Sequence, residues 1–226
     1  MTPPLWLTNL AARARALLPS SLATGFQPAW EALPPLTVDA DGWLVGDGVT
    51  IIKSHRSWQY PGLATKDGEP EAIVAHYTAT DPGTAVGMAK RRVQPWADFA
   101  AGYRRSYPGK PVPQNSWHVS AEANGALVQM ASFKVGCWHA VGSIKGVGAA
   151  NRTSASVELV GHGKVFPDLQ VLGAARLWRA LVRAYAVPEA LAMVPHAVID
   201  PEHRSDPGPV WMRQHAPAVL EYAFAS

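Results

Sequence analysis

Ala72-Ile-Val-Ala-His-Tyr-Thr78 is a short stretch of apolar and β-forming residues, and this composition predicts a buried strand. The stretch Ala155-Ser-Val-Glu-Leu-Val160 has the same character and predicts a second strand. Two further candidate strands, Trp117–Ala121 and Ala126–Met130, flank Asn124-Gly125, the dipeptide that supplies the positive φ angles of a tight hairpin turn. These segments together predict a β-sheet that contains one hairpin.

Helical patterns lie between and after these strands. Helical segments begin at Thr84 and are interrupted by Pro95. A longer helix is predicted from Asp168, a candidate N-cap, to about Tyr185, with apolar residues along one side. Leu191–Val194 then predicts a strand that delivers His196. We therefore expect an α/β (α+β) fold in which a central mixed β-sheet is flanked by helices on both faces, with a site at the strand ends.

The first 40 residues differ from the rest of the chain. Residues 4–18 place leucines and alanines at helical spacing, and a proline-containing stretch follows. We expect residues 1–40 to form a helix with a linker or strap, and residues 41–226 to form the main domain.

Composition limits the class of protein. The 226 residues are 48% hydrophobic and 16% charged, which is enough to bury a full core in a soluble globular protein. No stretch approaches the ~20 apolar residues that cross a bilayer, and Arg13 and Arg15 interrupt the first apolar segment, where a signal peptide needs an unbroken run. We expect neither a membrane span nor a signal peptide. Cys137, the single cysteine, is expected to be a small buried hydrophobe.

The charge balance is mildly basic. A net charge of +3 and a pI near 9.1 favour approach to an anionic polymer such as a bacterial wall, but they are too weak to predict nucleic-acid binding. Lys90-Arg91-Arg92 is the only run of three basic residues in the sequence. Such a run is more often a solvated helix face than a binding patch.

Three residues in separate segments could together bind a metal ion: His76, His196 and Asp206. Zn²⁺ takes imidazole nitrogens and carboxylate oxygens, and three protein ligands leave a fourth position open, as in catalytic sites. Each residue alone has an ordinary alternative, because histidines after apolar strands are commonly core or surface residues and Asp-Pro-Gly is a common turn. Glu158, in a mostly apolar strand, is either a functional carboxylate or the partner of an arginine.

Five motifs follow one another between about residue 70 and residue 215. They are Ile73-Val-Ala-His76-Tyr-Thr78, Ser116-Trp-His118 with Asn124-Gly125 and Gln129, Gly136-Cys-Trp138-His139-Ala140, Asn151-Arg-Thr-Ser-Ala-Ser-Val-Glu158-Leu159, and His196 followed ten positions later by Asp206 in Arg204-Ser-Asp206-Pro-Gly-Pro209. In this order they resemble the zinc-dependent type 2 N-acetylmuramoyl-L-alanine amidases, the family that includes phage endolysins, wall-recycling amidases and peptidoglycan recognition proteins. The resemblance implies the fold of that family.

The resemblance also implies hydrolysis of the amide between the lactyl group of N-acetylmuramic acid and L-alanine, with Zn²⁺ as the cofactor. It implies His76, His196 and Asp206 as metal ligands and Glu158 as general base. Arg204 stands where many members carry lysine, and a guanidinium keeps the positive charge that stabilises an oxyanion.

Aromatic and histidine residues beside the motifs are further candidates. The resemblance favours Trp138, His139 and His118 as substrate-binding residues, with core packing or support of the ligands as the alternative. Trp117 is also expected near substrate, whereas Trp96, Trp178 and Trp211 lie in helical stretches and are expected in the core. His203 lies between the ligands of the fifth motif, but the matching spacing favours its neighbours.

Alternatives to a lytic enzyme stay open. Some relatives in this family bind wall fragments after losing a metal ligand, so a non-catalytic peptidoglycan-binding recognition module is the main rival. A zinc enzyme acting on a different amide also stays open, because motifs specify the metal chemistry and leave the side pockets undetermined. We expect a protein made in the cytoplasm that acts on the bacterial cell wall after holin release or other delivery, with a cytoplasmic muropeptide-recycling amidase as the alternative. We expect a monomer whose partner is peptidoglycan or a muropeptide, with no nucleic-acid partner.

Overall fold

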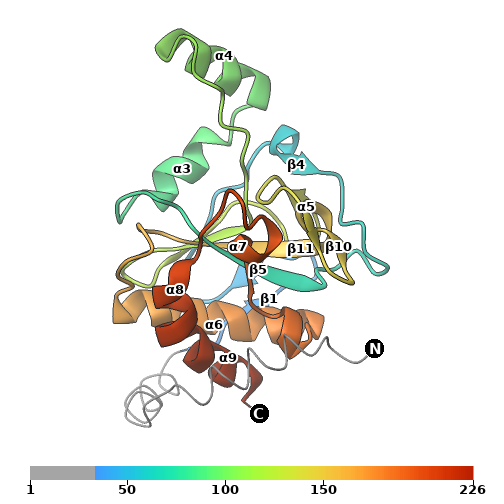
Figure 1. Cartoon of the computed structure of the whole chain (residues 1–226). Coiled ribbons are helices and arrows are strands. Elements are labelled where there is room, and N and C mark those ends of the chain that lie inside the picture. The colour runs from blue at the N-terminus through green and yellow to red at the C-terminus, as the bar shows by residue number, and fades with distance from the viewer. Residues whose placement is uncertain (1–33, 226) are drawn as a thin grey trace.

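A six-stranded mixed sheet forms the centre of the protein (Figure 1). The computed structural model describes residues 34–225, so the helix predicted at residues 4–18 lies outside the described residues. In spatial order the strands of the sheet are β12 (Val194–Pro195), β5 (Ala72–Tyr77), β11 (Ser154–Leu159), β6 (Val119–Ala121), β7 (Leu127–Gln129) and β3 (Val49–Ile51). Three two-stranded ribbons are also present: β1 (Thr37–Val38) with β2 (Leu44–Val45), β4 (Gln59–Tyr60) with β8 (Gly136–Cys137), and β9 (Ser143–Ile144) with β10 (Gly148–Ala149).

The predicted hairpin is confirmed, because β6 and β7 pair antiparallel around Asn124-Gly125. Gly125 has a φ of +83°, and a Cβ at this position would lie 2.6 Å from the carbonyl oxygen of Leu169. A side chain at this position would therefore strain the backbone and clash with the first turn of the helix that contains Leu169. All other neighbouring pairs of the sheet are parallel.

Helices lie on both faces of the sheet, as expected. They are α3 (Ala85–Arg91), α4 (Trp96–Ser106), α5 (Ala150–Thr153), α6 (Asp168–Tyr185), α7 (His196–Ile199), α8 (Gly208–Val210) and α9 (Ala216–Phe224), with the 3-10 helices η1 (Arg56–Trp58) and η2 (Glu189–Leu191) and the π-helix η3 (Trp211–His215). Figure 1 shows α6 and α9 on one side of the sheet and α3, α4, α5 and α7 on the other. The largest core cluster lies between the sheet and α6 with α9, and Trp178 and Trp211 are fully buried in it, as predicted.

Two local predictions were wrong. The strand predicted at Leu191–Val194 is reduced to the two residues of β12, and His196 begins the short helix α7. Pro195 explains the short strand, because proline has no N–H to donate to a neighbouring strand and is confined to sheet edges. At the start of α6, Pro167 occupies the N-cap and Asp168 lies in the first turn, where its charge still favours the helix dipole.

The packed structure begins before residue 40. Leu36 lies in the main core cluster, and the Arg176 Nε atom donates to the carbonyl oxygen of Pro34 at 3.0 Å. Whether residues 1–33 form a separate helix and linker stays a prediction, because they lie outside the described residues. Cys137 is fully buried, as expected, and burial raises its pKa to about 12, so it remains a thiol. Among the described residues, no helix is long and apolar enough to cross a membrane.

Candidate metal and catalytic centre

Alternate side chains of β5 and β11 point to opposite faces of the sheet, so one face packs in the core and the other carries polar residues. In β5, Ile73 and Ala75 belong to the core cluster under α6, so His76 points to the opposite face. In β11, Val157 and Leu159 face the same core and Glu158 points away from it. The strands pair in parallel with Glu158 directly beside His76. Two polar side chains are therefore fixed next to each other by rigid strands.

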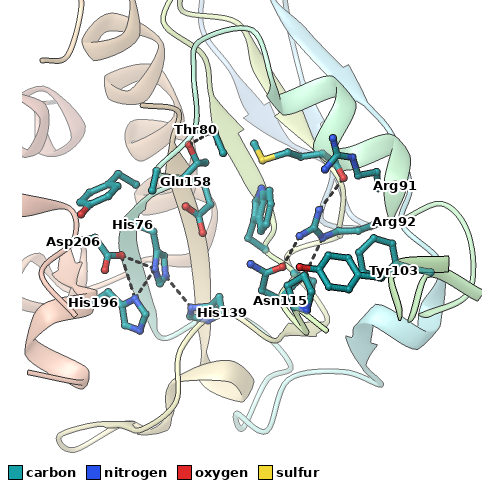
Figure 2. A pocket seen from close by; sticks show the side chains of 18 of the residues that line it. His76, Thr80, Arg91, Arg92, Tyr103, Asn115, His139, Glu158, His196 and Asp206 are labelled. Carbon is teal, nitrogen blue, oxygen red and sulfur yellow. Dashed lines mark hydrogen bonds and ion pairs between the residues drawn. The ribbon is translucent and has the colours of Figure 1, made fainter. Parts of the chain in front are cut away.

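His76, His196 and Asp206 come together as predicted (Figure 2). The Nδ1 atoms of the two histidines lie 3.0 Å apart, and each lies 3.1 Å from the Oδ2 atom of Asp206. All three residues are buried, so these atoms form a small triangle shielded from solvent. No other group of three such residues close enough to hold a metal ion occurs in the part of the chain that the structure describes.

Hydrogen bonds alone do not satisfy this triangle. Each imidazole Nδ1 holds at most one proton, and the carboxylate oxygen holds none. If both rings donate a proton to Asp206, their two N–H groups face each other across 3.0 Å, which is repulsive. If one ring instead leaves its Nδ1 atom without a proton, the lone pair on that nitrogen faces the carboxylate oxygen across 3.1 Å, which is also repulsive. A cation in contact with all three atoms removes the conflict. The sides of the triangle are also close to the separation of about 3.3 Å expected between ligands that bind a tetrahedral Zn²⁺ at about 2.0–2.1 Å. The three residues therefore fit a zinc ion.

The protonation states also suit a divalent cation. Burial lowers the pKa of His76, so its imidazole is neutral at physiological pH. Burial acts to raise the pKa of Asp206, but the adjacent imidazoles of His196 and His76 outweigh burial and hold the pKa below its ordinary value. Metal ions bind neutral imidazole and ionised carboxylate, so neither group must lose a proton before binding.

A chain of hydrogen bonds behind His76 fixes which of its nitrogens carries the proton. The Ser154 hydroxyl donates to the carbonyl oxygen of Ala150 at 2.7 Å, so it accepts from the His139 Nε2 atom at 3.3 Å. Burial keeps the pKa of His139 well below its ordinary value, and the neutral ring then has a lone pair on Nδ1. That lone pair accepts from the His76 Nε2 atom at 3.0 Å. The Nδ1 atom of His76 is left with a lone pair that points into the triangle.

Replacing His139 with phenylalanine is therefore expected to weaken zinc binding by about 10- to 100-fold, the usual effect of losing a hydrogen-bond partner behind a metal-binding histidine. His139→Asn is the matched control, because its side-chain oxygen can accept from His76 where Nδ1 does now, and it should retain most of the affinity. Zinc affinity is measured by competition with a chelator of known affinity. Equal affinities for the two variants would show that the hydrogen bond does not orient His76.

Glu158 is a buried carboxyl group with an unusual proton affinity. Burial raises its pKa from 4.5 to about 8, the negative charge of Asp206 adds to the rise, and Arg92 and Arg204 oppose it. Its Oε2 atom is buried and has no hydrogen-bond partner among the described residues. A carboxyl group with a raised pKa and an unsatisfied oxygen beside a metal site is suited to accept and release a proton.

Arg204 is exposed and lies on the wall of the cleft that contains these residues. Its charge acts on both Glu158 and His76. No described residue forms an ion pair with its side chain. His203 lines the same cleft, but its Nδ1 atom bonds to Asp200 at 2.8 Å, and it is not part of the triangle. The geometry therefore agrees with the spacing argument against His203.

The predicted substrate-binding residues do not all face the cleft. The prediction for His118 is wrong for this structure, because the ring is fully buried and its nitrogens bond to Ser156 at 2.9 Å and to the carbonyl of Val135 at 2.8 Å. His139 lines the cleft but uses both nitrogens in the chain behind His76. Trp138 packs against Trp58 and Tyr60 instead of lining the cleft. Substrate contact by Trp138 and His139 stays a prediction.

The burial of Arg92 was not predicted from the sequence, where the residue belongs to a basic run expected to be solvated. The structure buries its guanidinium over the rings of Trp117 and Trp58, at 4.2 and 5.3 Å from their centres. It donates to the carbonyl oxygen and the side-chain oxygen of Asn115, at 2.9 and 2.6 Å. Trp117 lines the cleft, as expected, but mainly as a face for Arg92. Trp96, expected in the core, is only half-buried.

The cleft has a volume of about 910 Å³ and extends well beyond the triangle. Figure 2 shows His76, His196 and Asp206 on one side, Arg91, Arg92 and Tyr103 on the other, and Glu158 between them. This volume lies near the upper end of the range for small-ligand sites. The cleft can therefore hold a substrate considerably larger than the bond that reacts.

Comparison with known proteins gives a consistent family. Residues 66–209 match the family model described as N-acetylmuramoyl-L-alanine amidase. The chain is 28% identical over 183 residues to the 1,6-anhydro-N-acetylmuramyl-L-alanine amidase AmpD of Escherichia coli, covering 76% of this chain and 92% of that protein. AmpD of Citrobacter freundii is 29% identical over 160 residues, covering 66% and 81%.

Solved structures give the same fold. A crystal structure of a selenomethionine AmpD derivative superposes with a TM-score of 0.58 at 26% identity, covering 80% of this chain and 98% of that one. The structure of PlyL superposes with a TM-score of 0.54 at 16% identity, covering 78% and 96%. The mixed sheet flanked by helices is therefore the amidase fold that the sequence predicted.

Proposed function

Because the chain belongs to the N-acetylmuramoyl-L-alanine amidase family, we propose that it hydrolyses the amide between N-acetylmuramic acid and L-alanine, with Zn²⁺ held by His76, His196 and Asp206. The observation that carries the proposal is the buried triangle of two Nδ1 atoms and one carboxylate oxygen beside Glu158. A recognition module that only binds would not need this combination, since it is costly to bury and supplies both a cation site and a proton acceptor.

The chemistry divides between the metal and the protein. Bound Zn²⁺ would lower the pKa of water toward neutrality and polarise the scissile carbonyl. Glu158, as a carboxylate, takes a proton from the attacking water through its unpaired Oε2 atom. As the C–N bond breaks, Glu158 gives this proton to the departing nitrogen, so the products are a carboxyl group on the sugar and an amine on L-alanine. The raised pKa of Glu158 helps it hold the proton between these two steps.

Arg204 is proposed to stabilise the negative charge that develops on the carbonyl oxygen. Its exposed guanidinium lines the cleft and has no described ion-pair partner, so it is available to substrate. Arg204→Ala is expected to lower kcat by about 100-fold, whereas Arg204→Lys, which restores the charge, should recover most of the loss. Arg213→Ala removes an exposed arginine outside the cleft lining and serves as the control. Steady-state kinetics test this role, and unchanged turnover in Arg204→Ala would refute it.

The substrate is proposed to be a soluble muropeptide. Both curated relatives described above are named for 1,6-anhydro-N-acetylmuramyl-L-alanine, which favours a soluble anhydro fragment over the intact wall. Similarity to PlyL, at 16% identity, bears on the fold alone. Endolysin-like wall lysis and delivery to the wall therefore stay predictions.

Incubation of the zinc-loaded protein with a purified anhydromuropeptide and, separately, with purified sacculi distinguishes these substrates by product mass. Cleavage of the soluble fragment with little release from sacculi is expected. Rapid release of stem peptides from sacculi would favour the lytic alternative, and binding of either substrate without cleavage would favour a recognition module.

A further inference from the structure

Residues 84–113, which contain α3 and α4, form an arm with a high net positive charge. They contain six lysines and arginines and one aspartate, a net charge of +5, while the whole chain has +3, so the other residues sum to −2. Figure 1 shows α4 standing away from the sheet, beyond α3. The arm is therefore a local cationic surface on a chain that is otherwise slightly acidic.

The base of the arm is fixed to the domain. The carboxylate of Glu122 accepts from the backbone N–H groups of Gly83 and Ala85, at 2.8 and 2.6 Å, at the start of α3. Arg92, at the end of α3, is held by Asn115, which follows the arm. Arg91 is next to this anchored residue, so its backbone is held at the wall of the cleft.

One face of the arm lines the same cleft as the metal triangle. Arg91 and Arg105 are exposed residues of this lining, and no hydrogen bond or ion pair involving their side chains occurs among residues 34–225. Asp98, the one acidic residue of the arm, also lines the cleft, and with buried Arg92 the lining keeps a net positive charge. Unlike Arg92, whose donors are occupied by Asn115 and Met88, these two arginines have their donors available for a ligand.

Aromatic rings lie between the charges. Phe99 and Tyr103 in α4 and Tyr107 at its C-cap follow one another, with ring centres 5.9 and 4.8 Å apart, and all three line the cleft. Guanidinium groups bind carboxylates through two parallel hydrogen bonds, and aromatic faces pack against aliphatic carbon. The arm thus offers both features to a ligand with carboxylates on an aliphatic frame.

The chemistry of the proposed substrate decides which half such a surface would bind. In the intact muramoyl amide the lactyl carboxyl is part of the bond to be cleaved, so the sugar half carries hydroxyl and acetamido groups and no charge. The peptide half carries at least its terminal carboxylate. We propose that Arg91 and Arg105, together with the ring of Tyr103 in the same cleft, bind the carboxylates of the peptide half and so orient the amide toward the metal triangle. This inference rests on the proposed function.

The arm provides matched controls for the test. Lys90 and Arg104 are exposed cations that directly precede Arg91 and Arg105 but lie outside the cleft lining. The double variants Arg91→Gln/Arg105→Gln and Lys90→Gln/Arg104→Gln therefore remove the same charge from the same helices. Each is compared with the unaltered protein on a soluble muropeptide with free carboxylates and on one whose carboxylates are amidated.

Arg91→Gln/Arg105→Gln is expected to raise KM for the free-carboxylate substrate by about tenfold or more. The change in kcat should be smaller, because the lost hydrogen bonds to the carboxylates are present in the ground state and in the transition state alike. The control variant should leave KM within about twofold. The unaltered protein should also prefer the substrate with free carboxylates. Equal effects of the two double variants would overturn the site in favour of general charge attraction, and so would equal KM values for the two substrates.

Direct binding separates failure of this inference from failure of the proposed function. Affinity of the zinc-loaded protein for the isolated stem peptide is measured by calorimetry, with the same variants. Binding that depends on Arg91 and Arg105 in a protein that cleaves no muropeptide would retain the site and refute the amidase. Cleavage with arginine-independent affinity would retain the amidase and refute the site.

Discussion

Glu158→Gln is expected to lower kcat by about 10²- to 10⁴-fold while zinc still binds, because glutamine keeps the shape of the side chain but cannot take a proton from water. The neighbouring triangle of His76, His196 and Asp206 does not use Glu158 as a ligand atom. Zinc affinity should therefore change little. Loss of activity together with loss of zinc would mean that Glu158 supports the metal site and not the proton transfer.

The same variant is expected to stabilise the metal-free protein at high pH. The pKa of Glu158 is raised from 4.5 to about 8 in the folded protein. The folded state therefore binds the proton more tightly than the unfolded chain, and stability falls as the pH rises from about 4.5 to about 8. Glutamine carries no charge to bury, so this loss disappears.

Melting temperatures of the metal-free proteins test the prediction. Glu158→Gln should melt higher than the unaltered protein by about 5 °C or more at pH 9, with little difference at pH 4.5. A difference that does not depend on pH would contradict the buried-carboxyl account of Glu158.

Asp206→Asn is expected to remove both zinc binding and activity. The carboxylate supplies the negative charge of the triangle, lies 3.1 Å from both Nδ1 atoms, and keeps a low pKa despite burial. Loss of a hydrogen-bond partner behind a ligand already costs about 10- to 100-fold in affinity, so loss of a direct ligand should cost more than about 100-fold. Asparagine keeps the size of the side chain, so the effect isolates its charge.

Asp200→Asn is the matched control, because it makes the same chemical change in the same segment at a carboxylate that pairs with exposed His203. It should retain zinc and most of the activity. Removing zinc from the unaltered protein with a chelator should abolish turnover, and added Zn²⁺ should restore it. Full activity in Asp206→Asn, or activity that survives removal of the metal, would contradict the assignment of the triangle.

Local patterns in the sequence predicted much of the fold. Asn124-Gly125 fixed the β6–β7 hairpin, because its turn requires a residue with positive φ. The one-sided apolar pattern of residues 168–185 predicted α6, although the observed helix begins one residue earlier than an N-cap at Asp168 implies. β12 was predicted with the wrong bounds, because a two-residue edge strand that contains a proline has no periodicity to read.

The site was predictable only in part. His76, His196 and Asp206 could be named from motif order, and the structure brings their ligand atoms together. The burial of Arg92 could not be read from the sequence, because Trp58 and the segment that holds Asn115 and Trp117 lie far apart in the chain and meet Arg92 only in the fold. A basic run looks the same in sequence whether its last residue faces water or a tryptophan.

His118 and His139 illustrate a second limit. Both stand in motifs beside the catalytic candidates, and their residue type alone cannot distinguish contact with substrate from support of a neighbour. The distinction depends on which ring nitrogens are already bonded. His118 bonds to Ser156 and Val135, and His139 joins His76 to Ser154. Only the three-dimensional arrangement fixes these partners.

The central claim is that the zinc-loaded triangle and Glu158 add water across the amide between the lactyl group and L-alanine. Mass analysis of a purified anhydromuropeptide, digested in water enriched in ¹⁸O, tests it most directly. The account predicts two products, an unlabelled peptide with a new N-terminal amine on L-alanine and a sugar fragment with one ¹⁸O in its lactyl carboxyl group. Intact substrate in the presence of protein that carries one zinc ion, or label in the peptide instead of the sugar, would contradict it.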